Sequence, residues 1–153
     1  MDFKTIVMTT DFSENADAAL PYAVELAKKF GAKLHLVHVF EEPHLYSGLA
    51  EGIVIGVSDW IAEGHKACTK KLEAAADTLA AKEKLKVTAK ALRGNPVTKV
   101  LEYADKQGAA CIVIATHGRT GLSHVVHGSV AERIVRQSRC PVLSVRPKKV
   151  KPG

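Results

Sequence analysis

Residues 111–121 have the sequence CIVIATHGRTG, in which four hydrophobic residues are followed by small and polar ones. A short apolar run without alternation is typical of a parallel strand that helices cover on both faces. The abrupt change after Ile114 marks the carboxyl end of such a strand. Open α/β sheets bind ligands beyond the carboxyl ends of their strands. This stretch therefore predicts both the fold class and the place where a functional site should lie.

Similar apolar runs, separated by segments of helical periodicity, occur along the rest of the chain. Strands are predicted at residues 6–8, 34–39, 87–92, 111–114 and 142–145, and helices at 13–30, from about 58 to 84, from 96 onward, and at 129–138. Strands that alternate with helices form βαβ units, whose strands are parallel and whose crossovers are right-handed. We therefore expect an open five-stranded parallel sheet, Rossmann-like, with strand order 3-2-1-4-5 and helices on both faces.

Several residues mark where these helices begin and end. Ser13 is a predicted N-cap, and Gly31 is a predicted C-terminal stop. Pro21 falls inside the first helix and should bend it or leave a carbonyl group without its partner. Asn95 followed by Pro96 is a strong helix start, with the asparagine as the cap. The stretch 41–56 lacks a clear period and is expected to be a mobile connection, with a lid over the site as its plausible role.

The length and composition predict one domain. The chain has 153 residues, and we assign 1–147 to a single folded domain and 148–153 to a basic tail. Hydrophobic residues make up 46% and charged residues 25%, which excludes a disordered chain. No apolar run approaches the roughly 20 residues that span a bilayer, and the N-terminus has no signal-peptide layout. We expect no membrane association, a cytoplasmic location, and reduced thiols at Cys68, Cys111 and Cys140.

The net charge of +6 raises the possibility of a nucleic-acid partner. The basic residues are scattered along the helices, and the chain has only four Phe, three Tyr and one Trp. A surface that stacks bases needs basic and aromatic side chains interleaved. We therefore expect no nucleic-acid binding.

Polar and small residues gather after the first and fourth strands. Thr9, Thr10 and Asp11 end the first, and residues 115–121 end the fourth. Gly128 and Ser129 then open a helix, in which Ser129 to Glu132 has the form of a capping box. The unpaired N–H groups of a helix N-terminus bind anions, and the guanidinium of Arg119 matches phosphate oxygens. The spacing alone leaves a second interpretation open, in which the glycines only shape a turn and Ser129 only caps the helix.

Other kinds of chemistry find less support. His124 and His127 could join His117 around a metal ion, but no carboxylate or thiolate stands at a matching spacing, so we expect no metal site. The chain lacks the lysine-bearing P-loop motif and the nucleophile elbow Gly-x-Ser-x-Gly. We therefore assign no catalytic residue.

Five segments together resemble the universal stress proteins, in their single-domain nucleotide-binding branch, and the resemblance covers essentially the full chain. The segments are Asp11-Phe12-Ser13, residues 32–39 with Gly31 before them, Ala115-Thr116-His117-Gly118, Gly128-Ser129 nine residues later, and Cys140-Pro141-Val142-Leu143. One position departs from the family, because Ala115 stands where the first glycine of the phosphate motif is expected. If that position needed a positive φ, alanine would cost about 1 kcal/mol. The β-like run before it instead favours a role as the last extended residue of the fourth strand.

The resemblance implies a bound adenine nucleotide, ATP or AMP, with Mg²⁺ as an optional companion. The adenine and ribose would lie against Thr9, Thr10, Asp11 and Val39. The phosphates would lie along Ala115, Thr116, His117, Gly118, Arg119, Thr120 and Gly121, and on Gly128, Ser129, Val130 and Ala131. Asp11 can accept ribose hydroxyls, as an acidic residue does in dinucleotide folds, and it is also our first choice for any metal-linked role.

The resemblance also implies a homodimer through the last strand, Val142 to Val145, whose edge would otherwise be exposed. The expected function is nucleotide binding in stress response or regulation with little or no turnover. Two alternatives stay open at this point. One is a slow ATPase or self-phosphorylating protein, and the other is a dimeric interaction module that binds no nucleotide.

Overall fold

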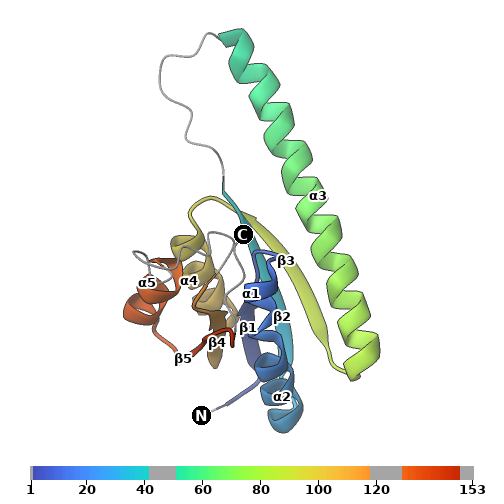
Figure 1. Ribbon diagram of the computed structural model, residues 1–153, viewed down its shortest axis with the longest axis vertical. Coiled ribbons are helices and arrows are strands. Elements are labelled where there is room, and N and C mark those ends of the chain that lie inside the picture. The colour runs from blue at the N-terminus through green and yellow to red at the C-terminus, as the bar shows by residue number, and fades with distance from the viewer. Residues whose placement is uncertain (1, 42–50, 118–128, 149–153) are drawn as a thin grey trace.

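A computed structural model describes residues 2–41, 51–117 and 129–148. Its five strands form one parallel sheet in the order β3-β2-β1-β4-β5, which confirms the predicted topology. The strands are β1 (Thr5–Thr9), β2 (Lys33–Phe40), β3 (Val87–Arg93), β4 (Cys111–Ala115) and β5 (Val142–Val145). Each contains the run predicted from sequence (Figure 1).

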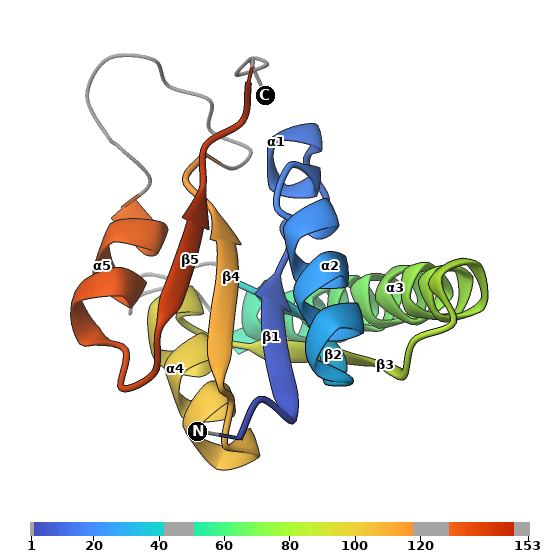
Figure 2. The ribbon, with the colours of Figure 1, turned by 90° about the horizontal axis from the view of Figure 1, so that it is seen from below.

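Helices cover both faces of the sheet, so the central strands have no exposed side. Figure 2 shows α1, α2 and α3 on one face and α4 and α5 on the other. Successive side chains of β1 point to opposite faces of the sheet. Ile6 and Met8 pack against the face covered by α1, α2 and α3, and Val7 packs against the face covered by α4 and α5. All three are buried, which explains why this strand is a continuous apolar run.

The first helical segment is divided, which corrects the single bent helix predicted over 13–30. It consists of α1 (Glu14–Asp17) and α2 (Leu20–Phe30), and Pro21 lies in the first turn of α2. A proline there removes an N–H that would have had no partner in any case, so it starts a helix and does not bend one. The predicted ends are confirmed. The Ser13 hydroxyl accepts a hydrogen bond from the Ala16 amide, and Gly31 ends α2 in the left-handed region with φ 63°.

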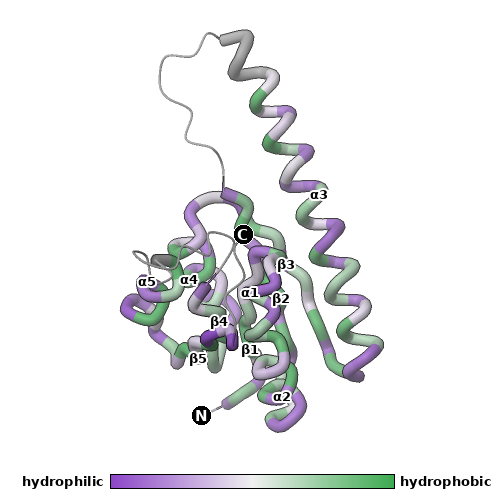
Figure 3. Tube along the Cα trace, viewed as in Figure 1, coloured by the Kyte–Doolittle hydropathy of each residue, from purple (hydrophilic) through white to green (hydrophobic). Residues whose placement is uncertain are grey.

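The long helix α3 (Glu51–Glu83) begins at Glu51, earlier than the predicted start near residue 58. The connection predicted over 41–56 is therefore helical from 51 onward, and 42–50 lie outside the described residues. The helix extends beyond the sheet at its N-terminal end (Figure 1), and hydrophobic and hydrophilic residues are mixed along it (Figure 3). Ile61, Leu72 and Leu79 are its buried large side chains in the described part.

The second face carries α4 (Pro96–Gln107) and α5 (Ser129–Gln137). The Asn95 side chain accepts a hydrogen bond from the Thr98 amide at 3.1 Å, which confirms the predicted cap. Val97, Val100 and Ala104 of α4 and Ile134 of α5 are buried against β1, β2 and β4. These two helices flank the carboxyl end of β4, where the candidate site lies.

Candidate functional site

The strand order reverses between β1 and β4, which lie side by side. Val7 pairs with Ile112 and Met8 with Val113, while β2 and β3 extend on one side and β5 on the other. Because the two strands are parallel, the residues that follow them emerge at the same edge of the sheet. The structure thus brings the Thr10–Asp11 segment and the Thr116–His117 segment to adjacent strand ends. This is the position at which doubly wound sheets bind ligands.

The segment after β1 is fixed by local hydrogen bonds. The Thr10 amide donates to the Val37 carbonyl at 2.9 Å, and the Thr10 hydroxyl accepts from the Phe12 amide at 3.0 Å. Oδ1 of Asp11 accepts from both the amide and the hydroxyl of Ser13, at 3.0 and 2.5 Å. These contacts hold the carboxylate of Asp11 at the entrance to α1.

Phe12 has a positive φ of 63°, which is uncommon for an aromatic residue. Its ring centroid lies 4.5 Å from that of His38 on β2, and Lys71 Nζ of α3 lies 4.5 Å from the same centroid. A tilted ring–ring contact with His38 and a cation–π contact with Lys71 support the strained backbone from two sides. The β1 end of the site is therefore tied to both β2 and α3.

The predicted Val39 is the next residue of β2 after His38. It pairs with Leu92 of β3 and is partly buried against the layer that contains α4 and α5. Its side chain thus lies on the face opposite to that of His38, because neighbouring side chains of a strand alternate. This is the same face on which α5 begins.

Ala115 is the last residue of β4 and pairs with Val145 of β5. It is not among the non-glycine residues of the described chain that have a positive φ, which are Phe12 and Lys84. The interpretation of Ala115 as the last extended residue is confirmed, so its methyl group creates no backbone strain. Directly after it, the Thr116 amide donates to the Val145 carbonyl at 2.9 Å, and the Thr116 hydroxyl lies 2.9 Å from His117 Nδ1.

Part of the predicted phosphate loop lies outside the described residues, namely Gly118, Arg119, Thr120, Gly121 and Gly128, together with the side chain of Ser129. Beyond the loop, Ser129 is the first residue of α5. Val130 and Ala131 follow in its first turn, where Val130 is partly buried and Ala131 is buried against the core of this face. The helix therefore begins where the sequence predicts it.

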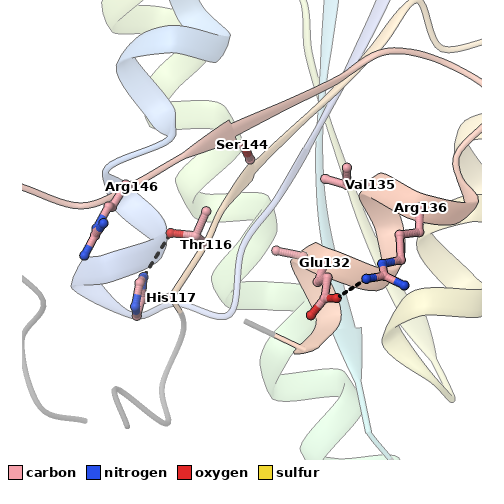
Figure 4. Close-up of a pocket in the computed structure, with 8 residues that line it drawn as sticks. Thr116, His117, Glu132, Val135, Arg136, Ser144 and Arg146 are labelled. Atoms are coloured by element: carbon pink, nitrogen blue, oxygen red, sulfur yellow. Dashed lines mark hydrogen bonds and ion pairs between the residues drawn. The ribbon is translucent and has the colours of Figure 1, made fainter. Parts of the chain in front are cut away.

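A pocket of about 390 Å³ opens between the carboxyl ends of β4 and β5 and the first turns of α5 (Figure 4). Its lining includes three predicted site residues and five that sequence reasoning missed: Thr116, His117 and Ala131 were predicted, and Glu132, Val135, Arg136, Ser144 and Arg146 were not. Arg136 and Glu132 form an ion pair at 2.9 Å. The alternation of side chains along a strand places Ser144 and Arg146 on one side of the chain, but only the pairing of β5 with β4 shows that this side faces the pocket.

Neither a metal cluster nor a spanning helix is found in the ranges the structure covers. No group of three His, Cys, Asp or Glu side chains in 2–41, 51–117 and 129–148 could hold a metal ion, and His124 and His127 lie outside these ranges. None of the described helices has the length and apolar character needed to cross a bilayer. The three cysteines are free thiols, and burial raises the pKa of Cys111.

A sequence model of the universal stress protein family matches residues 2–146. The chain belongs to the universal stress protein family. Universal stress protein MJ0531 of Methanocaldococcus jannaschii is 34% identical over 148 residues, which cover 96% of this chain and 85% of that protein. Universal stress protein YxiE of Bacillus subtilis is 31% identical over 147 residues, which cover 94% and 99%.

Solved universal stress protein structures share the fold. UspA from Lactobacillus plantarum matches with a TM-score of 0.82 at 19% identity and covers 95% of this chain and 99% of that one. The universal stress protein from Archaeoglobus fulgidus in complex with dAMP matches with a TM-score of 0.62 at 24% identity, covering 94% and 98%. A universal stress protein in complex with cAMP matches with a TM-score of 0.60 at 22% identity, covering 95% and 98%. At these identities the likeness shows the architecture, and the site must be argued from the residues of this chain.

Proposed function

We propose that this universal stress protein binds an adenine nucleotide, ATP or AMP, and acts in stress response or regulation with little or no turnover. The observation that carries the proposal is the pairing of β1 with β4 at the reversal of strand order, which brings Asp11 and Thr116–His117 to one edge. The two solved relatives in complex with dAMP and cAMP support the same ligand class.

In this proposal the base and ribose lie at the ends of β1 and β2, against Thr9, Thr10, Asp11 and Val39. Oδ1 of Asp11 already accepts two hydrogen bonds from Ser13. An ionised carboxylate has about four lone-pair sites on its two oxygens. Asp11 can therefore hold the start of α1 and accept a ribose hydroxyl at the same time.

The phosphates would then lie along residues 115–121 and at the N-terminus of α5, on Gly128 to Ala131. A helix N-terminus supplies N–H groups and partial positive charge to an anion. Ala131, in the first turn of α5, is buried in the core cluster that includes Ile112 and Ile114 of β4, so this end of the helix is packed against the sheet. A bound Mg²⁺ would have Asp11 as its nearest predicted carboxylate.

Low turnover follows from what phosphoryl transfer requires. The reaction depends on exact positioning and on strong neutralisation of the developing charge, usually by metal ions held by several carboxylates. The proposal of low turnover rests on the predicted site residues, among which Asp11 is the one carboxylate. A slow ATPase or self-phosphorylating activity is the second candidate. Phosphate release faster than about one turnover per minute with ATP and Mg²⁺, abolished by Gly118→Asp, would favour that activity over simple binding.

Calorimetric titration with AMP and with ATP tests the binding claim. Asp11→Asn is the most informative variant. It removes the negative charge, but its amide oxygen can still accept the hydrogen bonds from the amide and hydroxyl of Ser13. We expect this variant to have the same thermal unfolding temperature as the wild type and to bind both nucleotides at least tenfold more weakly. Asp105→Asn removes the same charge from the last turns of α4, away from the site, where the Asp105 carboxylate forms an ion pair with Arg139 at 3.4 Å. An absence of heat and of thermal shift at millimolar nucleotide would leave only the interaction-module interpretation.

We also propose a homodimer through β5, which lies at the edge of the sheet. An unpaired edge strand presents free N–H and C=O groups that favour association. Sedimentation at micromolar concentration should show a species of twice the 16.4 kDa chain mass, and a 16.4 kDa species alone would contradict the dimer. The cytoplasmic location and the boundary at residue 147 stay predictions.

A further inference from the structure

Arg146 stands directly beyond β5, at the outer end of the pocket described above. Its side chain is on the same side of the strand as that of Ser144 and lines the pocket with Thr116 and His117 (Figure 4). Val145, which precedes it, pairs with Ala115 and accepts a hydrogen bond from the Thr116 amide. The backbone therefore fixes the base of the Arg146 side chain against the first residues of the predicted phosphate loop.

The charges of the pocket leave Arg146 available for an anion. Arg136 is neutralised by Glu132, with 2.9 Å between the charged atoms. Arg146 is exposed, and within 2–41, 51–117 and 129–148 no ion pair is found for it. An arginine stays charged at any ordinary pH, and its planar fork matches two phosphate oxygens at once. The pocket thus offers one uncompensated guanidinium next to Thr116 and His117.

The order of the strands decides which phosphate this guanidinium would meet. From the base site to the pocket the strands run β2, β1, β4, β5. Neighbouring strands are about 4.8 Å apart, so β5 is roughly 10 Å from β1 and roughly 14 Å from β2. If the base lies at β1 and β2, as in the proposed site, and the first phosphate lies near β1 and β4, then the further phosphates are the part of the ligand that extends toward β5.

We propose that Arg146 binds the terminal phosphates of the nucleotide and makes the site prefer a di- or triphosphate to a monophosphate. This inference rests on the proposed adenine-nucleotide site and adds the ligand class to it. Arg146 is then a specificity-determining residue directly after β5, the strand that sequence reasoning assigned to dimer contact alone.

Titration with AMP, ADP and ATP tests it on the wild type, Arg146→Gln and Arg139→Gln. Arg139 is exposed, pairs with Asp105 at 3.4 Å and lies before β5, at the other end of the strand, so its variant removes the same charge away from the pocket. We expect Arg146→Gln to weaken ATP binding at least tenfold, to change AMP binding less than twofold, and to abolish the preference for ATP. Arg139→Gln should leave all three affinities within twofold. Arg146→Lys keeps the charge but not the fork and should give an intermediate loss.

Two results would overturn the inference while leaving nucleotide binding intact. One is an equal loss for AMP and ATP in Arg146→Gln, and the other is no loss for either ligand. If the wild type bound neither nucleotide, the proposed function would fail, and inorganic tripolyphosphate would then test Arg146 by itself. Binding of tripolyphosphate that Arg146→Gln weakens tenfold would support the role of this residue, and no binding would reject it.

Discussion

Nδ1 of His38, on β2, lies 2.8 Å from the backbone carbonyl oxygen of Thr10, just beyond the end of β1. A carbonyl oxygen only accepts, so Nδ1 must carry the proton. His38 is 7% exposed, and its ring also contacts the Phe12 ring at a tilt of 42°, with 4.5 Å between the ring centroids. A buried side chain of one strand thereby holds the segment that we propose contacts the ribose. Sequence analysis did not select His38, because a histidine within an apolar strand has no distinctive local signal.

The first prediction concerns this hydrogen bond. His38→Phe keeps the ring against Phe12 but leaves the Thr10 carbonyl without its donor, whereas His38→Asn keeps an N–H donor and loses the ring. An acceptor left without its donor costs about 1–3 kcal/mol when it is buried, and the Thr10 carbonyl is partly buried, so the lower half of that range applies. We expect His38→Phe to lower the free energy of unfolding by about that amount in urea titrations. Its AMP affinity should fall severalfold, because the Thr10–Asp11 segment loses its anchor.

The Asn variant separates the two contacts. If the hydrogen bond matters more than the ring contact with Phe12, His38→Asn should retain more nucleotide affinity than His38→Phe, even where the two variants are equally destabilised. The opposite order would show that the ring contact with Phe12 positions the segment.

The sequence predicted the sheet and its order because each strand is an apolar run at a regular distance from a helix. The prediction of one helix over 13–30 was wrong, because the apolar period continues from α1 into α2 and gives no sign of the break at Ala18 and Ala19. The predicted start of α3 was also wrong, because Gly52 and Gly56 are poor helix formers and made this stretch look like a connection. Local preference could not reveal that the helix nevertheless begins at Glu51.

For the site, the polar strand ends were predictable because they interrupt apolar runs. Arg146 and Arg136 were not, because only the pairing of β4 with β5 and the packing of α5 bring them beside Thr116. One arginine in a basic C-terminal segment is indistinguishable from a solvated charge until the strand register is known.

The second prediction concerns Ala115→Gly, which restores the residue expected from the family motif. Because Ala115 ends β4 and does not have a positive φ, glycine relieves no strain there. It adds chain entropy to the unfolded state, so we expect the free energy of unfolding to fall by about 0.5–1 kcal/mol. Chemical denaturation measures this, and a rise in stability would instead indicate a strained backbone at residue 115.

The third prediction concerns Pro21→Ala. A proline in a helix interior costs about 3 kcal/mol, so its removal from a bent helix would be strongly stabilising. In the first turn of α2 the proline fits the backbone and restricts the unfolded chain. We therefore expect Pro21→Ala to lower stability by about 0.4–1 kcal/mol. A stabilisation of several kcal/mol in thermal or urea unfolding would restore the interpretation of 13–30 as one bent helix.

The fourth prediction is a pH dependence that originates at His35, on β2. The side chain is 5% exposed, its Nδ1 lies 2.9 Å from the Tyr103 hydroxyl, and no described residue bonds its Nε2. Burial, with a smaller contribution from the charge of Lys33, lowers the pKa of His35 below its ordinary value of 6.5. Burial also raises the pKa of Tyr103, so the phenol stays protonated.

Because the pKa of His35 is lower in the folded state, the unfolded chain binds a proton at a pH where the folded chain does not. Its contribution to stability is fully present above pH 6.5 and is lost as the pH falls from there through the folded-state pKa. His35→Gln cannot titrate but can still bond the Tyr103 hydroxyl, which makes it the matched control. We expect the wild type to lose more unfolding free energy than His35→Gln between pH 7.5 and pH 5.5 in urea titrations. Equal losses in the two proteins would mean that His35 binds a proton as readily in the folded chain as in the unfolded one. That result would contradict the assignment of His35 as a neutral buried histidine.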